Sequence, residues 1–181
     1  MTSYGWLFDP KRCMECGACE AACKQWNGVE TGVNVRWRRV LRMESGSFPQ
    51  VSVLALSLSC NHCENAFCMK ACPVKAIRRR EDGIVLLDES KCVGCGQCYM
   101  FCPYGAPQLN LATRKSSKCT MCADRIDQGL QPACATNCPT GALQWGRWEE
   151  IENRGSDRIG RFVYPMQMKP HIRFVTEPWQ S

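Results

Sequence analysis

Long hydrophobic runs are missing from this sequence of 181 residues. The longest apolar stretches are residues 51–58 and 84–87, far short of the roughly 20 residues that a membrane-spanning helix needs. Neither a charged segment followed by an apolar one nor a twin-arginine signal stands at the N-terminus, so no export signal is predicted. We therefore expect no direct membrane span, and a cytoplasmic chain by default unless a partner exports it or holds it at a membrane.

The sequence is also poor in histidine, with only His62 and His171, and common catalytic signatures are missing. It has no Ser–His–Asp set, phosphate-binding loop or dinucleotide fingerprint, since Gly94 and Gly96 are interleaved with cysteines. A Cys-x3-Cys-x2-Cys triplet, which marks radical enzymes, does not occur either. We therefore expect a chain that is not an enzyme by itself.

Cysteine, by contrast, accounts for 16 residues, and all of them fall into four motifs. In chain order these are Cys13-x2-Cys16-x2-Cys19-x3-Cys23, Cys60-x2-Cys63-x4-Cys68-x3-Cys72, Cys92-x2-Cys95-x2-Cys98-x3-Cys102 and Cys119-x2-Cys122-x11-Cys134-x3-Cys138. Motifs two, three and four each end in Cys-Pro. Cysteines three residues apart on a short loop point toward one centre, which suits a metal site better than cross-links between distant segments.

Three uses of these cysteines compete: disulfides, zinc sites and iron–sulfur clusters. Disulfides are disfavoured because no secretion signal indicates an oxidising compartment. An all-thiolate zinc protein with a structural or interaction role is the alternative from a different class, since paired Cys-x2-Cys also binds zinc. Three closely spaced cysteines and a more distant Cys-Pro are instead typical of bacterial two-cluster ferredoxins. At four thiolates per cluster, the sequence predicts four [4Fe-4S] clusters as cofactors.

The positive charge of the chain has to be corrected for these clusters. The formal net charge is +6, a value that by itself suggests nucleic acid as a partner. Each oxidised cluster with four thiolates adds about −2, which brings the loaded protein to a net charge near −2. We therefore expect the lysines and arginines to balance the clusters, and no nucleic-acid partner.

The middle of the chain, residues 59–107, resembles a complete bacterial two-cluster ferredoxin, with a hairpin turn at Asp82-Gly83. In that family the fourth cysteine of each motif serves the neighbouring cluster. The resemblance implies that cluster 3 is held by Cys60, Cys63, Cys68 and Cys102, and cluster 4 by Cys92, Cys95, Cys98 and Cys72. The same exchange between motifs one and four implies Cys13, Cys16, Cys19 and Cys138 for cluster 1, and Cys119, Cys122, Cys134 and Cys23 for cluster 2.

This nested arrangement resembles the iron–sulfur electron-transfer subunits of the dimethyl sulfoxide reductase type. The likeness covers residues 4 to about 145 and includes the runs Tyr-Gly-Trp-Leu-Phe-Asp-Pro-Lys-Arg-Cys, Cys-Asn-His-Cys-Glu-Asn and Lys-Cys-Thr-Met-Cys-Ala-Asp-Arg. It implies a subunit that conducts electrons between a large molybdenum or tungsten pterin catalytic subunit and a quinone-linked membrane anchor or a soluble electron carrier. The alternatives are the electron-transfer subunit of a hydrogenase and a free polyferredoxin.

The expected fold is α+β: two nested two-cluster ferredoxin-like units with short strands and helices, a β-hairpin insertion and an irregular C-terminal tail. Residues 1–58 and 108–148 form the outer unit, with a hairpin over 33–58, and residues 59–107 form the inner unit. The hairpin either packs the two units together or offers Trp37 and its arginines to a partner. Residues 149–181 contain three prolines and four large aromatic residues, which predicts an extended tail on the chain itself or on a partner.

Overall fold

The computed structural model describes residues 3–31, 35–160 and 162–175, and it has an α+β fold of short elements. The strands are β1 (Tyr4–Phe8), β2 (Arg39–Ser47), β3 (Gln50–Leu58), β4 (Ile77–Arg79), β5 (Val85–Leu87), β6 (Gln108–Asn110), β7 (Lys115–Ser117), β8 (Leu143–Arg147) and β9 (Ile172–Phe174). The helices are η1 (Pro10–Arg12), α1 (Ala18–Asn27), α2 (Phe67–Lys70), α3 (Gln97–Met100), α4 (Ala123–Ile126), α5 (Ala133–Thr136) and α6 (Trp148–Ile151).

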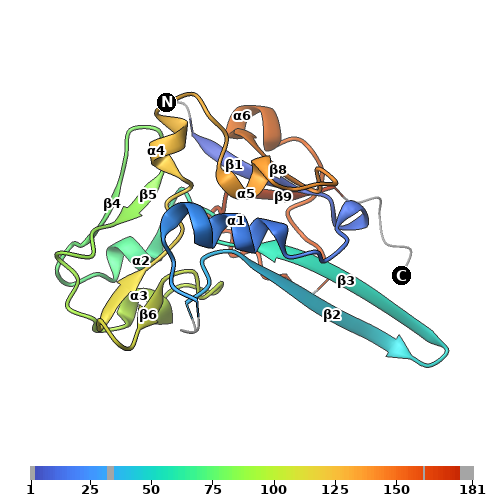
Figure 1. Ribbon diagram of the computed structural model, residues 1–181, viewed down its shortest axis with the longest axis horizontal. Helices are drawn as coiled ribbons and strands as arrows, with labels where there is room; N and C mark the ends of the chain where they lie inside the picture. The colour runs from blue at the N-terminus through green and yellow to red at the C-terminus, as the bar shows by residue number, and fades with distance from the viewer. Residues whose placement is uncertain (1–2, 32–34, 161, 176–181) are drawn as a thin grey trace.

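One three-stranded sheet combines strands from both ends of the described chain, β1 and β9, with β8, the strand that follows motif four. Its strand order is β8-β1-β9, with β8 antiparallel and β9 parallel to β1. Trp6 in the central strand pairs with Trp145 on one side and Ile172 on the other. Trp6, Leu7 and Phe8 are fully buried, as expected for a central strand covered on both faces. Figure 1 shows this sheet beside α5 and α6.

The segment between motifs two and four forms a separate set of small elements. The antiparallel pair β4–β5 contains the hairpin predicted at Asp82-Gly83, and β6–β7 is a second antiparallel pair. Figure 1 places both beside α2 and α3, at the left of the molecule. A small core of Ala66, Ile77 and Val85 with Cys68 and Cys98 packs β4 and β5 against α2 and α3.

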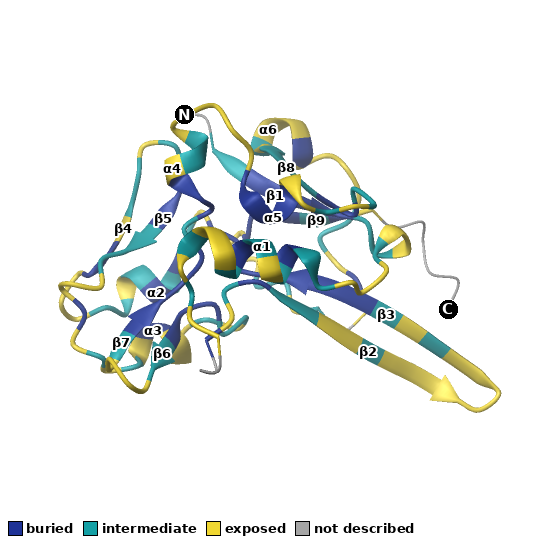
Figure 2. Ribbon diagram, viewed as in Figure 1, coloured by how far each residue is buried: buried dark blue, intermediate teal, exposed yellow. Residues whose placement is uncertain are grey.

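A long hairpin, β2–β3, projects from the body (Figure 1). At its base the end of β3 is buried and the start of β2 is partly buried, whereas its tip is exposed (Figure 2). The first strand begins at Arg39 rather than near residue 33, and residues 32–34 lie outside the described part of the chain. Before Arg39 the backbone bonds to side chains and not to a partner strand: Lys24 donates to the Val35 carbonyl oxygen. Trp37 donates to the Ser117 hydroxyl at 2.9 Å, so the base of the hairpin packs on its own chain.

The described part of the predicted tail, residues 149–160 and 162–175, also packs on its own chain. Ile159, Ile172 and Phe174 are buried in the main core. The Phe162 ring meets Phe174 edge-on at 4.8 Å and stacks on Tyr104 at 5.2 Å. The predicted boundaries at 58, 107 and 148 stay predictions, although β9 shares a sheet with β1.

In the ranges described, the chain has no helix long and apolar enough to cross a bilayer.

Candidate iron–sulfur sites

The sixteen cysteines gather in space into four groups, each of which combines three cysteines of one motif with the last cysteine of another. We number them so that group 1 is Cys13, Cys16, Cys19 and Cys138; group 2 is Cys23, Cys119, Cys122 and Cys134; group 3 is Cys60, Cys63, Cys68 and Cys102; and group 4 is Cys72, Cys92, Cys95 and Cys98. These are the same sets that the ferredoxin resemblance implied.

Groups 1, 3 and 4 each line a cavity. Each of the three cavities is lined by all four cysteines of its group. Most of the other lining side chains are apolar, for example Val74, Ile77 and Leu87 around group 4, whereas Asn61 and His62 also line the cavity of group 3. Apolar walls of this kind limit the access of water to whatever the thiols hold.

Group 2 lies where α1 meets α5, and all four of its cysteines are buried. Asn27, at the end of α1, donates through Nδ2 toward the sulfurs of Cys122 at 3.6 Å and Cys23 at 3.9 Å. Burial, followed by repulsion from Cys119 and Cys134, raises the pKa of Cys23 far above its ordinary value. Three thiols of motif four thus converge on the helix of motif one.

Glycine allows two of the cysteine loops to turn into helices. Gly17 and Gly96, each two residues before the third cysteine of its motif, have φ values of +72° and +74° and cap α1 and α3. That conformation is costly for residues with a Cβ. The sharp turn keeps the first two cysteines on the loop and places Cys19 and Cys98 in the first turn of the helices.

Backbone N–H groups point at many of the sulfurs. The final cysteines of the Cys-Pro motifs accept from residues four or five positions later, with N···S distances of 3.2 Å for Ala76 to Cys72, 3.5 Å for Ala106 to Cys102 and 3.4 Å for Leu143 to Cys138. Cys92 and Cys119 accept from Ser116 and Met121 at 3.3 Å each. Hydrogen bonds to sulfur stabilise the thiolate form and tune a bound cluster. The donor set therefore fits a thiolate-ligated cluster.

Burial raises the pKa of several of these thiols. Burial and then repulsion from Cys60 raise the pKa of Cys68 from 9.0 to about 12. Cys138 is different: burial raises its pKa, but the Leu143 N–H and the Thr140 hydroxyl outweigh burial and bring it below 9.0. Thiols must lose their protons to ligate metal, so loading these sites releases protons.

The four groups are linked in the order 1–2–3–4 by pairs of neighbouring thiols. Burial is the main reason why the pKa of Cys134 in group 2 is raised, and Cys19 of group 1 adds to it. Cys60 of group 3 in the same way adds to the raised pKa of Cys119 in group 2. Cys98 of group 4 adds to that of Cys68 in group 3. Each junction thus joins consecutive groups.

Exposure differs along this order. The two end groups each contain one exposed cysteine, Cys16 in group 1 and Cys95 in group 4. All four cysteines are buried in group 2, and in group 3 only Cys102 is partly exposed. The series is therefore closed to solvent in the middle and approaches the surface at its two ends.

Two buried cations beside the thiols could not be anticipated from the sequence. Arg38 donates to Cys134 Sγ at 3.5 Å, and Lys118 donates to Cys60 Sγ at 3.5 Å. Both side chains are 2% exposed. Lys118 directly precedes a motif, but so does the exposed Lys91. Arg38 is one of four arginines in residues 36–42, and none of the other three is buried. The sequence therefore gives no signal that marks Arg38 or Lys118 as buried. His62, inside motif two, is also buried and accepts the Val85 N–H.

A single zinc ion would hold four sulfurs at about 2.3 Å each, within about 4 Å of one another. Across the described ranges, no three Cys, His, Asp or Glu side chains are arranged to hold a single ion. Four ligands of a cubane are bonded to four different irons and lie farther apart.

Comparison with known proteins identifies the type of site. A model of the 4Fe-4S dicluster domain matches residues 51–148, and a model of the 4Fe-4S binding domain matches residues 10–26. With sixteen cysteines in four groups, these matches make the cofactors four [4Fe-4S] clusters.

Three curated relatives cover most of the chain. The probable anaerobic dimethyl sulfoxide reductase chain YnfG of Escherichia coli (strain K12) is 40% identical over 161 residues, which are 84% of this chain and 78% of the relative. Thiosulfate reductase electron transfer subunit PhsB of Salmonella typhi is 42% identical over 150 residues, covering 82% and 78%. A putative dimethyl sulfoxide reductase iron-sulfur subunit of Halobacterium salinarum is 36% identical over 192 residues, covering 90% and 72%. Motif spacing, site geometry and these matches together show that the chain belongs to the iron–sulfur electron-transfer subunits of the dimethyl sulfoxide and thiosulfate reductase type.

Proposed function

We propose that each of the four groups holds one [4Fe-4S] cluster and that electrons pass along the chain in the order of groups 1, 2, 3 and 4, in either direction. The observation that carries this proposal is the exposure profile: Cys16 and Cys95 are exposed at the two ends, whereas the cysteines of group 2 are all buried. A wire between two partners needs accessible ends and an insulated middle. The nested outer and inner units, with boundaries at residues 58, 107 and 148, are part of the same proposal.

The chain supplies the surroundings of the clusters and performs no substrate chemistry itself. A bound [4Fe-4S] cluster with four protein ligands provides one-electron transfer and has no open site for a substrate. The residues of this chain hold the thiolates, direct backbone N–H groups at the sulfurs and exclude water through side chains such as Ile77 and Leu87. These contributions set cluster potentials without making the chain an enzyme.

The partner at one end is a large molybdenum or tungsten pterin catalytic subunit, and the partner at the other end is a membrane anchor or a soluble electron carrier. The relatives belong to dimethyl sulfoxide and thiosulfate reductases by name, which supports a catalytic partner. By family resemblance group 1 faces that subunit. Exposed apolar side chains next to the end cysteines, Met14 beside Cys16 and Val93 beside Cys95, fit surfaces that partners cover.

The test is the metal content of the native complex, purified without oxygen through a tag on this chain. We expect about sixteen irons per copy of the chain beyond what the partner binds, at four irons per cluster, and molybdenum or tungsten in a co-purifying large subunit. Iron without either metal would contradict the proposed partner. Zinc in place of iron would contradict the clusters themselves.

A further inference from the structure

Two buried cations lie at successive junctions between the cysteine groups. Among the described lysines and arginines, only Arg38 and Lys118 are buried. Arg38 lies between Cys134 of group 2, which it contacts, and Ser57, which contacts Cys19 of group 1, and Lys118 lies at the junction of groups 2 and 3. Taking a charge out of water costs several kcal/mol unless the surroundings compensate it. The anionic thiolates beside these cations are the compensation that the structure offers.

Arg38 bonds directly to group 2 and is tied to group 1 through Ser57, whose hydroxyl lies 3.4 Å from Cys19 Sγ. Its guanidinium donates to the Ser57 carbonyl oxygen at 3.1 Å and to Cys134 Sγ at 3.5 Å, and it lies 4.3 Å from the centre of the Trp6 ring. Nε has no hydrogen-bond partner in the described part of the chain. The Nε–H is thus a third donor of the guanidinium, beside the two terminal nitrogens that already donate.

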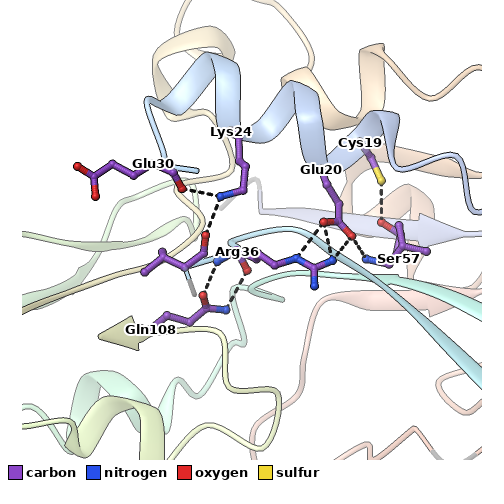
Figure 3. A network of polar contacts seen from close by, with 9 residues as sticks. Cys19, Glu20, Lys24, Glu30, Arg36, Ser57 and Gln108 are labelled. Atoms are coloured by element: carbon purple, nitrogen blue, oxygen red, sulfur yellow. Dashed lines mark hydrogen bonds and ion pairs between the residues drawn. The ribbon is translucent and has the colours of Figure 1, made fainter. Parts of the chain in front are cut away.

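The backbone on either side of Arg38 is clamped, so its side chain is held in the interior. Glu20 on α1 accepts from the Arg36 guanidinium and from the Val40 N–H, and Gln108 on β6 bonds both the N–H and the carbonyl of Arg36. Lys24 donates to the carbonyl oxygen of Val35 at 2.9 Å. Figure 3 shows this network spanning α1, the segment before β2 and β6. The position of Arg38 is therefore defined by α1 and β6, two segments of the proposed outer unit that lie far apart in the sequence.

Lys118 has three acceptors for its ammonium group. Nζ donates to Cys60 Sγ at 3.5 Å, to the Cys119 carbonyl oxygen at 2.9 Å and to the Val85 carbonyl oxygen. Three acceptors and no donor match the three N–H bonds of a charged ammonium. Lys118 thus places one positive charge between Cys119 of group 2 and Cys60 of group 3.

We propose that Arg38 and Lys118 are positioning residues for electron transfer that raise the reduction potentials of the central clusters, those of groups 2 and 3. This inference rests on the proposed assignment of the groups to clusters. Each electron that a cluster accepts adds one negative charge, and a fixed positive charge nearby stabilises the reduced state more than the oxidised state. Because both cations are buried, solvent and salt screen this effect little. The sulfurs that accept from the two cations belong to groups 2 and 3, so we expect the clusters of these two groups to respond most when the charges are removed.

The experiment is a redox titration of the four clusters, followed by electron paramagnetic resonance, in the intact complex purified without oxygen. Arg38→Met and Lys118→Met remove the charges and keep apolar bulk, whereas Arg38→Lys and Lys118→Arg keep the charges. Iron content is measured on every sample before titration. We expect both Met variants to retain iron and to show at least one midpoint potential shifted to a more negative value. The charge-keeping variants shift less, and the shifts persist at high ionic strength.

The chain offers a matched control for Lys118. Lys91 precedes the first cysteine of motif three as Lys118 precedes that of motif four, but its side chain is 65% exposed and pairs with Asp88 at 3.7 Å. Arg42, with a 57% exposed side chain on β2, serves the same purpose for Arg38. Lys91→Met and Arg42→Met leave all four midpoint potentials unchanged if burial beside the thiols is what matters.

Unchanged potentials in Arg38→Met and Lys118→Met, with iron retained, would overturn the inference. Equal shifts in the Lys91→Met and Arg42→Met controls would also overturn it, because net charge and not position would then be responsible. Loss of iron from both Met variants would overturn it too, by assigning the cations to cluster retention. A wild-type complex with fewer than four clusters would instead contradict the proposed function.

Discussion

The carboxylate of Glu20 accepts hydrogen bonds from two nitrogens of the Arg36 guanidinium, from Nε at 3.0 Å and from a terminal nitrogen at 2.7 Å. The same carboxylate accepts the backbone N–H of Val40. Glu20 belongs to the helix of motif one, and its two partners stand on either side of Arg38 (Figure 3). One side chain thus ties the helix that carries Cys19 and Cys23 to the segment that carries the buried cation.

This relationship predicts that Glu20→Ala destabilises the chain. The Glu20 side chain is only 17% exposed, and its loss leaves a guanidinium and a backbone N–H without their acceptor, at a cost of about 1–3 kcal/mol. The matched control is Glu44→Ala, because Glu44 and Arg42 form a pair with side chains 60% and 57% exposed, a kind worth about 0–1 kcal/mol. The midpoint of urea unfolding under anoxic conditions measures both. Equal losses would mean that the Glu20 network contributes no more than a surface pair.

The exchange of cysteines between motifs predicts reciprocal effects for two substitutions. Cys102→Ser damages the cluster of group 3 and spares that of group 4, although Cys102 belongs to motif three. Cys72→Ser does the reverse. The iron content and the paramagnetic signals of the reduced protein report which cluster is changed. If Cys102→Ser instead removes the cluster built on Cys92, Cys95 and Cys98, the exchange is wrong.

The exposure profile predicts an order of reactivity toward mild oxidant. Cys16 and Cys95 are exposed, whereas Cys119 and Cys134 are buried. During limited oxidation, an alkylating reagent should therefore label the cysteines of groups 1 and 4 before those of group 2, because reagent and released iron have a shorter path there. Mass spectrometry of peptides sampled over time gives the order. Early labelling of Cys119 would contradict an insulated middle.

His171 predicts a loss of stability on acidification. Burial is the main reason why its pKa falls to about 4 from 6.5. Its Nδ1 lies 3.1 Å from the Tyr4 carbonyl oxygen, and its ring stacks on Trp148 at 4.5 Å. The charged groups that act on it are Arg79 and Arg173, which lower the pKa, and Glu64, which raises it. Between pH 6.5 and about 4 the unfolded chain binds a proton at this position that the folded chain does not, so stability falls as pH falls through that window.

At pH 5 this effect amounts to about 2 kcal/mol relative to neutral pH. His171→Gln removes the titrating group. The difference in unfolding free energy between wild type and variant should therefore move by about that amount between pH 7.5 and pH 5, in favour of the variant. Acid damage to the clusters acts on both proteins and cancels in the difference. A difference that does not change with pH would show that His171 titrates alike in the folded and unfolded chains.

Local spacing was enough to predict the chemistry of this protein. Cysteines three residues apart on a short loop face one centre wherever the loop lies in the fold, so four cysteine motifs indicated four [4Fe-4S] clusters. The Asp82-Gly83 turn between β4 and β5 is equally local. Family resemblance supplied the pairing of motifs, which spacing alone left open.

Contacts between distant segments decided the rest. Arg38 and Lys118 look like any other basic residues in the sequence. Arg38 is buried because β1, β3 and α5 pack around it. Lys118 is buried because β5 and motif two pack around it. The place of β9 was also decided by distant contacts, because this strand pairs with β1 across 163 residues of intervening chain. Burial depends on which surfaces meet, and a short motif does not contain that information. Cluster type therefore followed from the order of residues, whereas the charges around the clusters followed from the tertiary packing.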